Sequence, residues 1–367
     1  MRIVAGVDCH KRSHTIVFLD GLGQVVQHLT IPTTADGYEQ ALMVGDSLGC
    51  VEWGVEGAGC YGFAFAVYAS AHEAVVVEVP GAFTKRHRRH ASQRGKSDAQ
   101  DARAIAEVVL REPDRLPKFF LAATQRALRL RYDQRDRLVR ERTRAVNRLR
   151  MGAILLGVTE LPTDLTTAKA ARRIITQARG LREAVQLGPA GAAIVDEIEE
   201  AAEDVLRLNE RIKGAEKAIR PLVRKIAAEL LQLHGVSDVV AAGLIGHAGD
   251  MRNYRNAAAF AAKCGAAPVP CSSGRNTAMR VNTGGDRQLN RLLHTIALTQ
   301  VRTEDHEGRR YYDRKRAEGK THLAALRCLK RVLAGVVYYR LRASDQVLNR
   351  VDAQDGHERD RTLAVAA

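Results

Sequence analysis

Five short runs rich in β-branched residues, separated by turn and helix signals, constrain the fold of this chain more than any other feature. They span residues 3–7, 15–19, 25–31, 51–56 and 74–79. The first three are joined by short links, one of them Gly21-Leu22-Gly23, which is typical of an antiparallel meander. Helix-like segments follow at residues 37–48, 61–72 and 98–110. The predicted order is three strands, then helix, strand, helix, strand and helix.

This order is that of the ribonuclease H-like fold, an α/β fold in which three antiparallel strands are continued by parallel ones. In that fold the first and fourth strands are neighbours, and ligands bind at the carboxyl ends of the strands. Asp8 ends the first strand and Glu56 ends the fourth. Asp98 and Asp101 are three residues apart on the third helix, which places both on one face. We therefore expect these four acids to lie together.

Four carboxylates in one place cannot all stay ionised without cations. Oxygen ligands of this kind suit Mg²⁺ or Mn²⁺, and two such ions can clamp a phosphodiester. Each acid alone also has a structural explanation, since Asp98 can serve as a helix N-cap and Asp8 as a turn residue. The combination favours a metal site. His10 and His14 are interpreted as loop residues.

The charge balance predicts a polyanionic partner. The 367 residues include 57 Lys and Arg against 42 Asp and Glu, a net charge of +15, and forty-five of the cations are Arg. The guanidinium forks onto phosphate, so this bias suits nucleic acid. A basic segment that includes Lys85, Arg86, Arg88 and Arg89 leads into Asp98, as a phosphate-backbone substrate at an acidic metal site would require.

Several classes of protein are excluded. No run of about 18 uncharged apolar residues is present, as a membrane-spanning helix would need. The first residues carry no secretory leader, and the six Cys include no closely spaced pair, which argues against a disulfide scaffold or a zinc ribbon. We therefore expect a soluble, cytoplasmic protein.

Residues 121–224 are predicted to form a long helical coiled-coil linker. Residues 192–220 repeat apolar side chains at three-four spacing over four heptads, and residues 123–156 follow a similar pattern. The segment between them, 157–187, is interpreted as a connection rich in turn residues. Residues 126–150 hold ten Arg and three acids, and Arg140, Arg144 and Arg148 form one stripe that we expect to contact phosphate. A coiled coil also favours a homo-oligomer, a dimer or tetramer.

Residues 225–343 carry a second candidate site. Ser272-Ser273-Gly274 precedes a run of cations, which are Arg275, Arg280, Arg287 and Arg291. Serine is a weak nucleophile that needs activation, and these cations can hold a phosphate and stabilise its transition state. A Ser beside Gly is equally typical of an ordinary turn, so the residues alone leave both roles open. Residues 344–367 are polar and aperiodic and are expected to be a disordered tail.

Six segments together resemble the insertion-sequence one-ten (IS110) family of transposases, also called DEDD transposases, which are bridge-RNA-guided recombinases. In chain order they are GVDCHKRSH, VEGAGCYG, KSDAQDARAIA, RTRAVNRLR, GAAPVPCSSGRNTAMRVNTGGDRQLNRLLHTIA and GKTHLAALRCLKR. The likeness extends from about residue 3 to residue 342. Each motif alone is modest, and their occurrence in this order is specific.

The resemblance implies a RuvC-like N-terminal domain, a coiled-coil linker and a helical C-terminal transposase domain. It carries the catalytic, Mg²⁺-binding acids onto Asp8, Glu56, Asp98 and Asp101. It carries the nucleophilic serine onto Ser273, although Ser272 adjoins it. In such a family the serine forms a covalent phosphoserine with DNA, and a structured guide RNA pairs with donor and target DNA.

Two other functions stay open. A RuvC-like nuclease that cuts branched DNA with metal-activated water would need the acids but not Ser273. A non-catalytic nucleic-acid-binding regulator would need neither. The presence of all four acids and the serine favours the recombinase.

Overall fold

The computed structural model describes residues 2–81, 83–84, 97–120, 123–158, 160–184, 188–273 and 276–365. The chain forms two compact units, Met1–Leu121 and Ala122–Ala367, and each is described by itself. In the part of the chain that is described, no helix is both long and apolar enough to cross a membrane.

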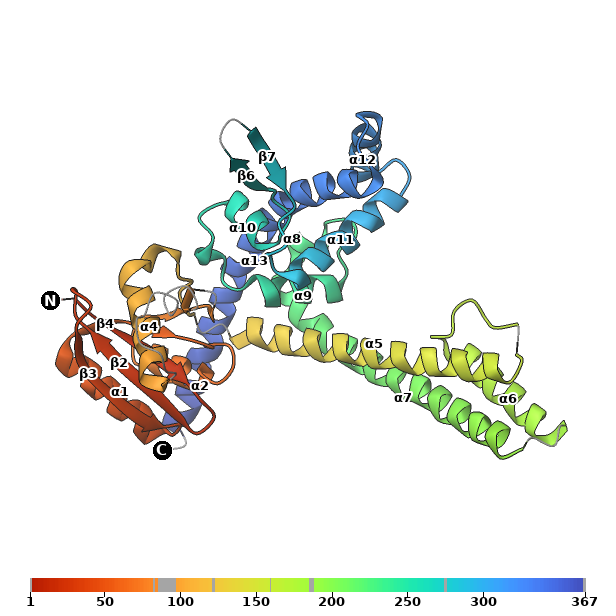
Figure 1. Cartoon of the computed structure of the whole chain (residues 1–367), viewed down its shortest axis with the longest axis horizontal. Helices are drawn as coiled ribbons and strands as arrows, with labels where there is room; N and C mark the ends of the chain where they lie inside the picture. The colour runs from red at the N-terminus through yellow and green to blue at the C-terminus, as the bar shows by residue number, and fades with distance from the viewer. Residues whose placement is uncertain are drawn as a thin grey trace. The chain divides into compact units, whose positions relative to one another are not determined.

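The first unit is built on a five-stranded sheet of order β3-β2-β1-β4-β5 (Figure 1). β1 (Ile3–Cys9), β2 (Ser13–Leu19) and β3 (Val25–Pro32) form an antiparallel meander. β4 (Cys50–Val55) pairs in parallel with β1, and β5 (Val76–Glu78) pairs in parallel with β4. The predicted strand order and the predicted pairing of the first and fourth strands are confirmed.

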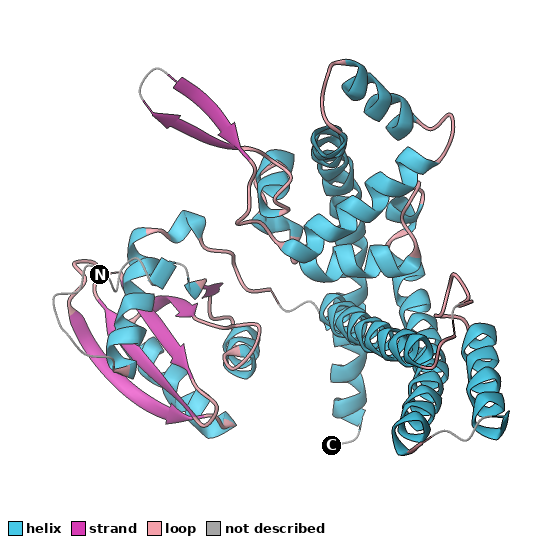
Figure 2. Ribbon diagram, turned by 45° about the vertical axis from the view of Figure 1, so that its right-hand side comes forward, coloured by secondary structure: helices cyan, strands magenta, loops and turns pink. Residues whose placement is uncertain are grey.

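Helices cover both faces of this sheet, which explains why β1 and β2 are buried along almost their whole length (Figure 2). On one face α1 (Ala35–Leu48) and α2 (Phe63–Ala71) bury a cluster centred on Phe18, Trp53 and Phe65. On the other face α4 (Asp98–Arg111) packs on Val4, Val17 and Val77. A short 3-10 helix, η1 (Pro113–Arg115), follows α4.

Gly6 in the middle of β1 allows α4 to approach the sheet closely. A Cβ at this position would collide with the backbone carbonyl of Ala102 and the backbone nitrogen of Ala106. Both of these atoms belong to α4, whose first turn carries Asp98 and Asp101. Because Gly6 has no side chain, α4 can approach β1 closely. This approach determines how near Asp98 and Asp101 lie to the strand that carries Asp8.

The second unit begins with a helical pair. α5 (Ala123–Leu155) and α7 (Pro189–Ile226) lie side by side (Figures 1 and 2). Their shared core includes Leu138, Leu149, Ile198 and Val205. The expected connection between them is wrong in part, because it contains α6 (Ala168–Ala184), which buries Ala171 and Ile174 in the same core. Supercoiling of this pair stays a prediction.

The rest of the second unit is a helical domain with one hairpin. Its elements are α8 (Ala228–Leu231), α9 (Asp238–Ala248), η2 (Met251–Asn253), α10 (Ala257–Lys263), β6 (Val269–Ser273), β7 (Asn276–Arg280), α11 (Arg287–Arg302), α12 (Glu307–Ala317) and α13 (His322–Val365). The antiparallel β6–β7 hairpin stands out from the helices of this unit (Figure 2).

The disordered tail expected from residue 344 is wrong for its first residues, 344–348. α13 continues through this segment, and Ser344, Asp345 and Leu348 are buried. Leu341 and Leu348 are seven residues apart and join the same core, so a sparse helical repeat persists within a polar composition. Tertiary packing, rather than local hydropathy, holds this part of the helix.

Gly6→Ala is expected to destabilise the first unit by about 1–3 kcal/mol or more, because the added methyl meets backbone atoms that cannot rotate away. Gly59→Ala is the matched control, since a Cβ there has open space. Denaturant unfolding of the two variants measures the difference. Equal stability would contradict the close seating of α4 on β1.

Asp345→Asn is expected to stabilise the second unit at pH 8 by up to about 3 kcal/mol and to have little effect at pH 4. Burial and, after it, the charge of Asp250 raise the pKa of Asp345 from 3.8 to about 6. A carboxyl whose pKa is raised on folding stabilises the protein at low pH, and this stabilisation is lost as pH rises through about 6.

Calorimetric unfolding at the two pH values tests this prediction. Glu304→Gln removes the same charge at an exposed position and serves as the control. A variant indistinguishable from the parent at pH 8 would mean that the segment beyond residue 344 does not pack as described.

Candidate functional site

The first two acids lie at the ends of neighbouring parallel strands. Asp8 is the penultimate residue of β1 and is only 9% exposed. Glu56 directly follows β4, and its backbone nitrogen donates to the carbonyl oxygen of Val7 at 3.3 Å. The parallel register therefore places Glu56 beside the strand end that carries Asp8, as the sequence predicts.

The other two acids enter from α4. Ser97 caps this helix by accepting a hydrogen bond from the backbone nitrogen of Gln100, so Asp98 is the first helical residue rather than the cap. Asp101 is buried, whereas the side chain of Asp98 is 59% exposed. Both lie in the first turn, where the helix dipole favours negative charge.

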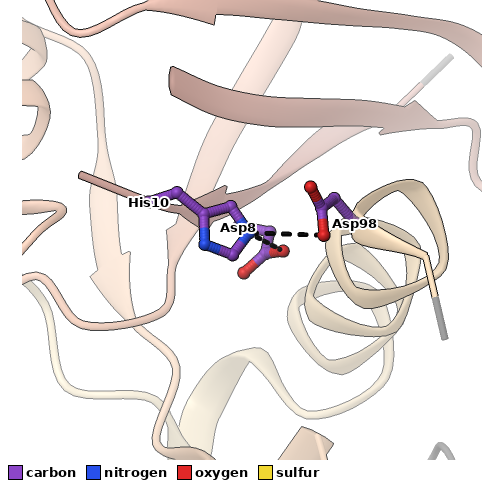
Figure 3. A group of neighbouring side chains, drawn as sticks. All are labelled: Asp8, His10 and Asp98. Atoms are coloured by element: carbon purple, nitrogen blue, oxygen red, sulfur yellow. Dashed lines mark hydrogen bonds and ion pairs between the residues drawn. The ribbon is translucent and has the colours of Figure 1, made fainter. Parts of the chain in front are cut away.

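His10 joins the two sets of acids (Figure 3). Its Nε2 lies 3.1 Å from Oδ2 of Asp8 and 3.4 Å from Oδ1 of Asp98. Among the described residues, Asp8, His10 and Asp98 form the group whose ligand atoms all lie within 4.8 Å of one another. His14, which was also interpreted as a loop residue, is instead buried within β2. His10 does lie in the link between β1 and β2, and its side chain faces the acids. Its position two residues after a strand-ending acid was the available signal.

The surroundings of Asp8 raise its proton affinity. Burial raises the pKa of Asp8, and the charges of Asp101 and Asp98 raise it further, whereas His10 opposes the shift. A buried carboxylate facing two more acids is unfavourable as an anion unless a cation compensates it. The donor atoms are carboxylate oxygens, which Mg²⁺ and Mn²⁺ prefer, so these residues fit a divalent cation.

Glu56 is held near this group, with room provided by a glycine. Its Oε1 lies 2.7 Å from the place that a Cβ of Gly81 would occupy. Its charge also contributes, after burial and Asp8, to raising the pKa of the neighbouring Cys9 thiol. Asp101 therefore belongs to the electrostatic surroundings of Asp8, and Glu56 to those of the adjacent Cys9, and neither is part of the tight three-residue group.

The candidate nucleophile lies on a hairpin rather than in an irregular loop. Ser273 is the last residue of β6 and pairs with Asn276, the first residue of β7, while Ser272 pairs with Thr277. In the sequence, Gly274 between two short runs that include Val269 and Thr277 was the available signal for this hairpin. Residues 274–275 lie outside the described part, so Arg275 is not placed.

The predicted cationic residues divide into three groups. Lys85, Arg86, Arg88 and Arg89 lie outside the described residues. Arg280 ends β7, Arg287 begins α11, and Arg291 lies one turn further on. The stripe on α5 forms the third group.

Carboxylates already engage several of these cations. Asp136 accepts from Arg140 and from Arg291, each at 2.7 Å, and Arg148 donates to Asp204 of α7 at 2.6 Å. Arg144 is exposed and has no carboxylate partner within the described ranges. Two of the three arginines that are expected to contact phosphate, Arg140 and Arg148, therefore already pair with a carboxylate.

Comparisons with known proteins agree on one family. The model of DEDD transposases of IS110 elements, described as "Transposase", matches residues 5–157. The model described as "Transposase IS116/IS110/IS902 family" matches residues 227–313.

Two relatives extend the likeness. The insertion element IS116 uncharacterized 44.8 kDa protein of Streptomyces clavuligerus is 27% identical over 93% of this chain and 95% of its own length. The insertion element IS900 uncharacterized 42 kDa protein of Mycobacterium paratuberculosis is 29% identical over 68% of this chain and 72% of its own.

The solved structure titled "T. thermophilus RuvC in complex with Holliday junction substrate" aligns with 32% of this chain and with 100% of its own chain. The identity is 16% and the TM-score is 0.27.

The family models and relatives define the chain as a transposase. It belongs to the IS110 family of insertion-sequence transposases, and the DEDD transposase model of that family matches its N-terminal part, residues 5–157. Membership of a transposase family implies DNA cleavage and strand transfer in general.

Asp98→Asn is expected to weaken Mn²⁺ binding on the order of tenfold or more, because it removes a charged oxygen from the group around Asp8. Isothermal titration calorimetry with the full chain measures the affinity. Asp46→Asn, at an exposed position on α1, removes the same charge and should leave binding unchanged. Identical affinities for Asp98→Asn and the parent would rule out this acid as a ligand.

Proposed function

We propose that this transposase cuts and rejoins DNA through a covalent phosphoserine at Ser273, assisted by Mg²⁺ at Asp8, Glu56, Asp98 and Asp101. The observation that carries the proposal is the convergence of a strand-end acid, a helix acid and His10 within 4.8 Å. Family membership supports a phosphodiester as the substrate.

Each group has a defined part in this reaction. The Ser273 oxygen forms a bond to phosphorus and loses its proton, while the bond from phosphorus to the leaving sugar oxygen breaks and that oxygen gains a proton. The hydroxyl of a second strand end then attacks the phosphoserine and restores the serine. Mg²⁺ would supply positive charge to the phosphate oxygens. Asp8 and Asp98 would hold the ion, and His10 would orient their carboxylates through the contacts described above.

We propose a structured guide RNA and a homo-oligomer, dimer or tetramer, as further partners. The net charge of +15 supports a nucleic-acid partner whose backbone, rather than sequence, is contacted by the protein. Arg144 on α5, which has no carboxylate partner among the described residues, is the member of the stripe best suited to phosphate.

Ser273→Ala is expected to abolish protein-linked DNA, since it removes the attacking oxygen. The full chain is incubated with DNA spanning an element junction, the RNA encoded by the element end and Mg²⁺, then denatured and resolved by electrophoresis. Ser272→Ala is the matched control and should retain the adduct.

Other outcomes select other functions. Cleaved ends without an adduct, unchanged in Ser273→Ala, would assign hydrolysis by a RuvC-like nuclease. An adduct lost in Ser272→Ala instead would move the nucleophile by one residue. Binding without any cleavage, when a relative with the same substrates does cleave, would assign a non-catalytic regulator.

A further inference from the structure

A large cavity lies at the base of the β6–β7 hairpin in the second unit. Its volume is about 1140 Å³, above the roughly 300–1,000 Å³ of most small-molecule sites. The end of the hairpin, the start of α11 and the first turns of α13 all contribute to its wall. The cavity is therefore large enough to hold a segment of a polymer.

The hairpin, α11 and α13 each contribute Lys or Arg side chains to the wall of the cavity. Among the described residues that line it, eight are Lys or Arg and none is Asp or Glu. Arg291 and Lys315 pair with Asp136 and Glu318. The other six have no carboxylate partner within the described part of the chain. They are Arg280, Arg287, Lys320, Arg327, Lys330 and Arg331.

Lys330 is oriented by a short chain of hydrogen bonds. The side-chain nitrogen of Asn290 donates to the carbonyl oxygen of Cys264 at 2.8 Å, which leaves the amide oxygen facing Lys330. Nζ of Lys330 donates to that oxygen at 2.8 Å. An ammonium has three donors, so two remain. Burial, and after it Arg327, lower the pKa of Lys330, and an anion in the cavity would offset that cost.

The wall also has an apolar part beside its cations and a few polar side chains. Ala266, Pro268, Val281 and Val332 line it together with the ring of Tyr311. Sites for single strands combine cations that follow the backbone with apolar and aromatic surface for the sugars and bases. A small anion would satisfy one or two of the cations and leave the apolar wall unused.

We propose that this cavity binds the phosphodiester backbone of a single nucleic-acid strand, DNA or RNA. The strand would contact Arg280 at the base of the hairpin and Arg327 on α13 together, and so would fix the hairpin that ends in Ser273. That last consequence rests on the proposed function, whereas binding itself does not.

Cys328 lies in the cavity wall and provides the probe. The full chain is alkylated with N-ethylmaleimide in the presence of EDTA, and modification is followed peptide by peptide. Short single-stranded DNA, RNA of the same sequence, and inorganic phosphate are compared. At about ten times the Kd of an oligonucleotide, the rate at Cys328 should fall about tenfold. Exposed Cys60, in the first unit, reports protection elsewhere in the same digest.

Two double variants test the charges. Arg327→Gln/Arg331→Gln removes two cations of the wall at positions one turn apart on α13, where Gln preserves the helix. The slope of log affinity against log salt for single-stranded DNA should become shallower by about 1.4, or 0.7 per lost phosphate contact. Arg255→Gln/Arg302→Gln removes two exposed cations of the same unit outside the wall and should leave the slope unchanged.

Protection by DNA, RNA or both supports the cavity as a strand site and identifies its source. Unchanged alkylation of Cys328 with both oligonucleotides, equal protection by inorganic phosphate, or an unchanged salt slope would overturn it. Protection without any protein-linked DNA would uphold the cavity and count against the serine mechanism. Protein-linked DNA without protection of Cys328 would uphold the serine mechanism and count against the cavity as a strand site.

Discussion

The seating of α4 on β1 is the contact on which the acidic site depends. At Gly6 the helix backbone approaches the strand so closely that no side chain fits between them. This contact is short, and closely packed interiors transmit small displacements. Because Asp8 follows two residues after Gly6 and Asp98 begins the helix, the same contact determines whether His10 can reach both carboxylates.

His10 partly offsets the repulsion between the carboxylates of this site. Asp8 is buried at a strand end and faces the charges of Asp98 and Asp101, and these factors raise its pKa. One imidazole nitrogen shared between two carboxylates can donate to only one of them at a time, so it satisfies the cluster incompletely. Carboxylates on a strand and on a helix are held by regular structure rather than by loops, which suits a preorganised metal site.

Local sequence signals were sufficient for the sheet and for the positions of Asp8 and Asp98, because strand ends and helix starts are marked by residues close in the chain. Their limits are equally physical. The role of His10 depends on Asp98, 88 positions further along, and no local pattern shows that contact. α6 was hidden by turn residues before it, and the helix beyond residue 344 by its polar composition. In both cases burial against distant residues decides the structure.

Packing, rather than composition, also decides which of the positive charges are available to bind an anion. On α5, Arg135, Arg140 and Arg148 are neutralised by Glu216, Asp136 and Asp204. A phosphate that binds there must displace a carboxylate, so the gain from the new pair is largely offset by the loss of the old one. Around the cavity below the hairpin, six cations face no carboxylate in the described structure. A cation in the wall of the cavity therefore contributes more to binding an anionic strand than a paired arginine on α5.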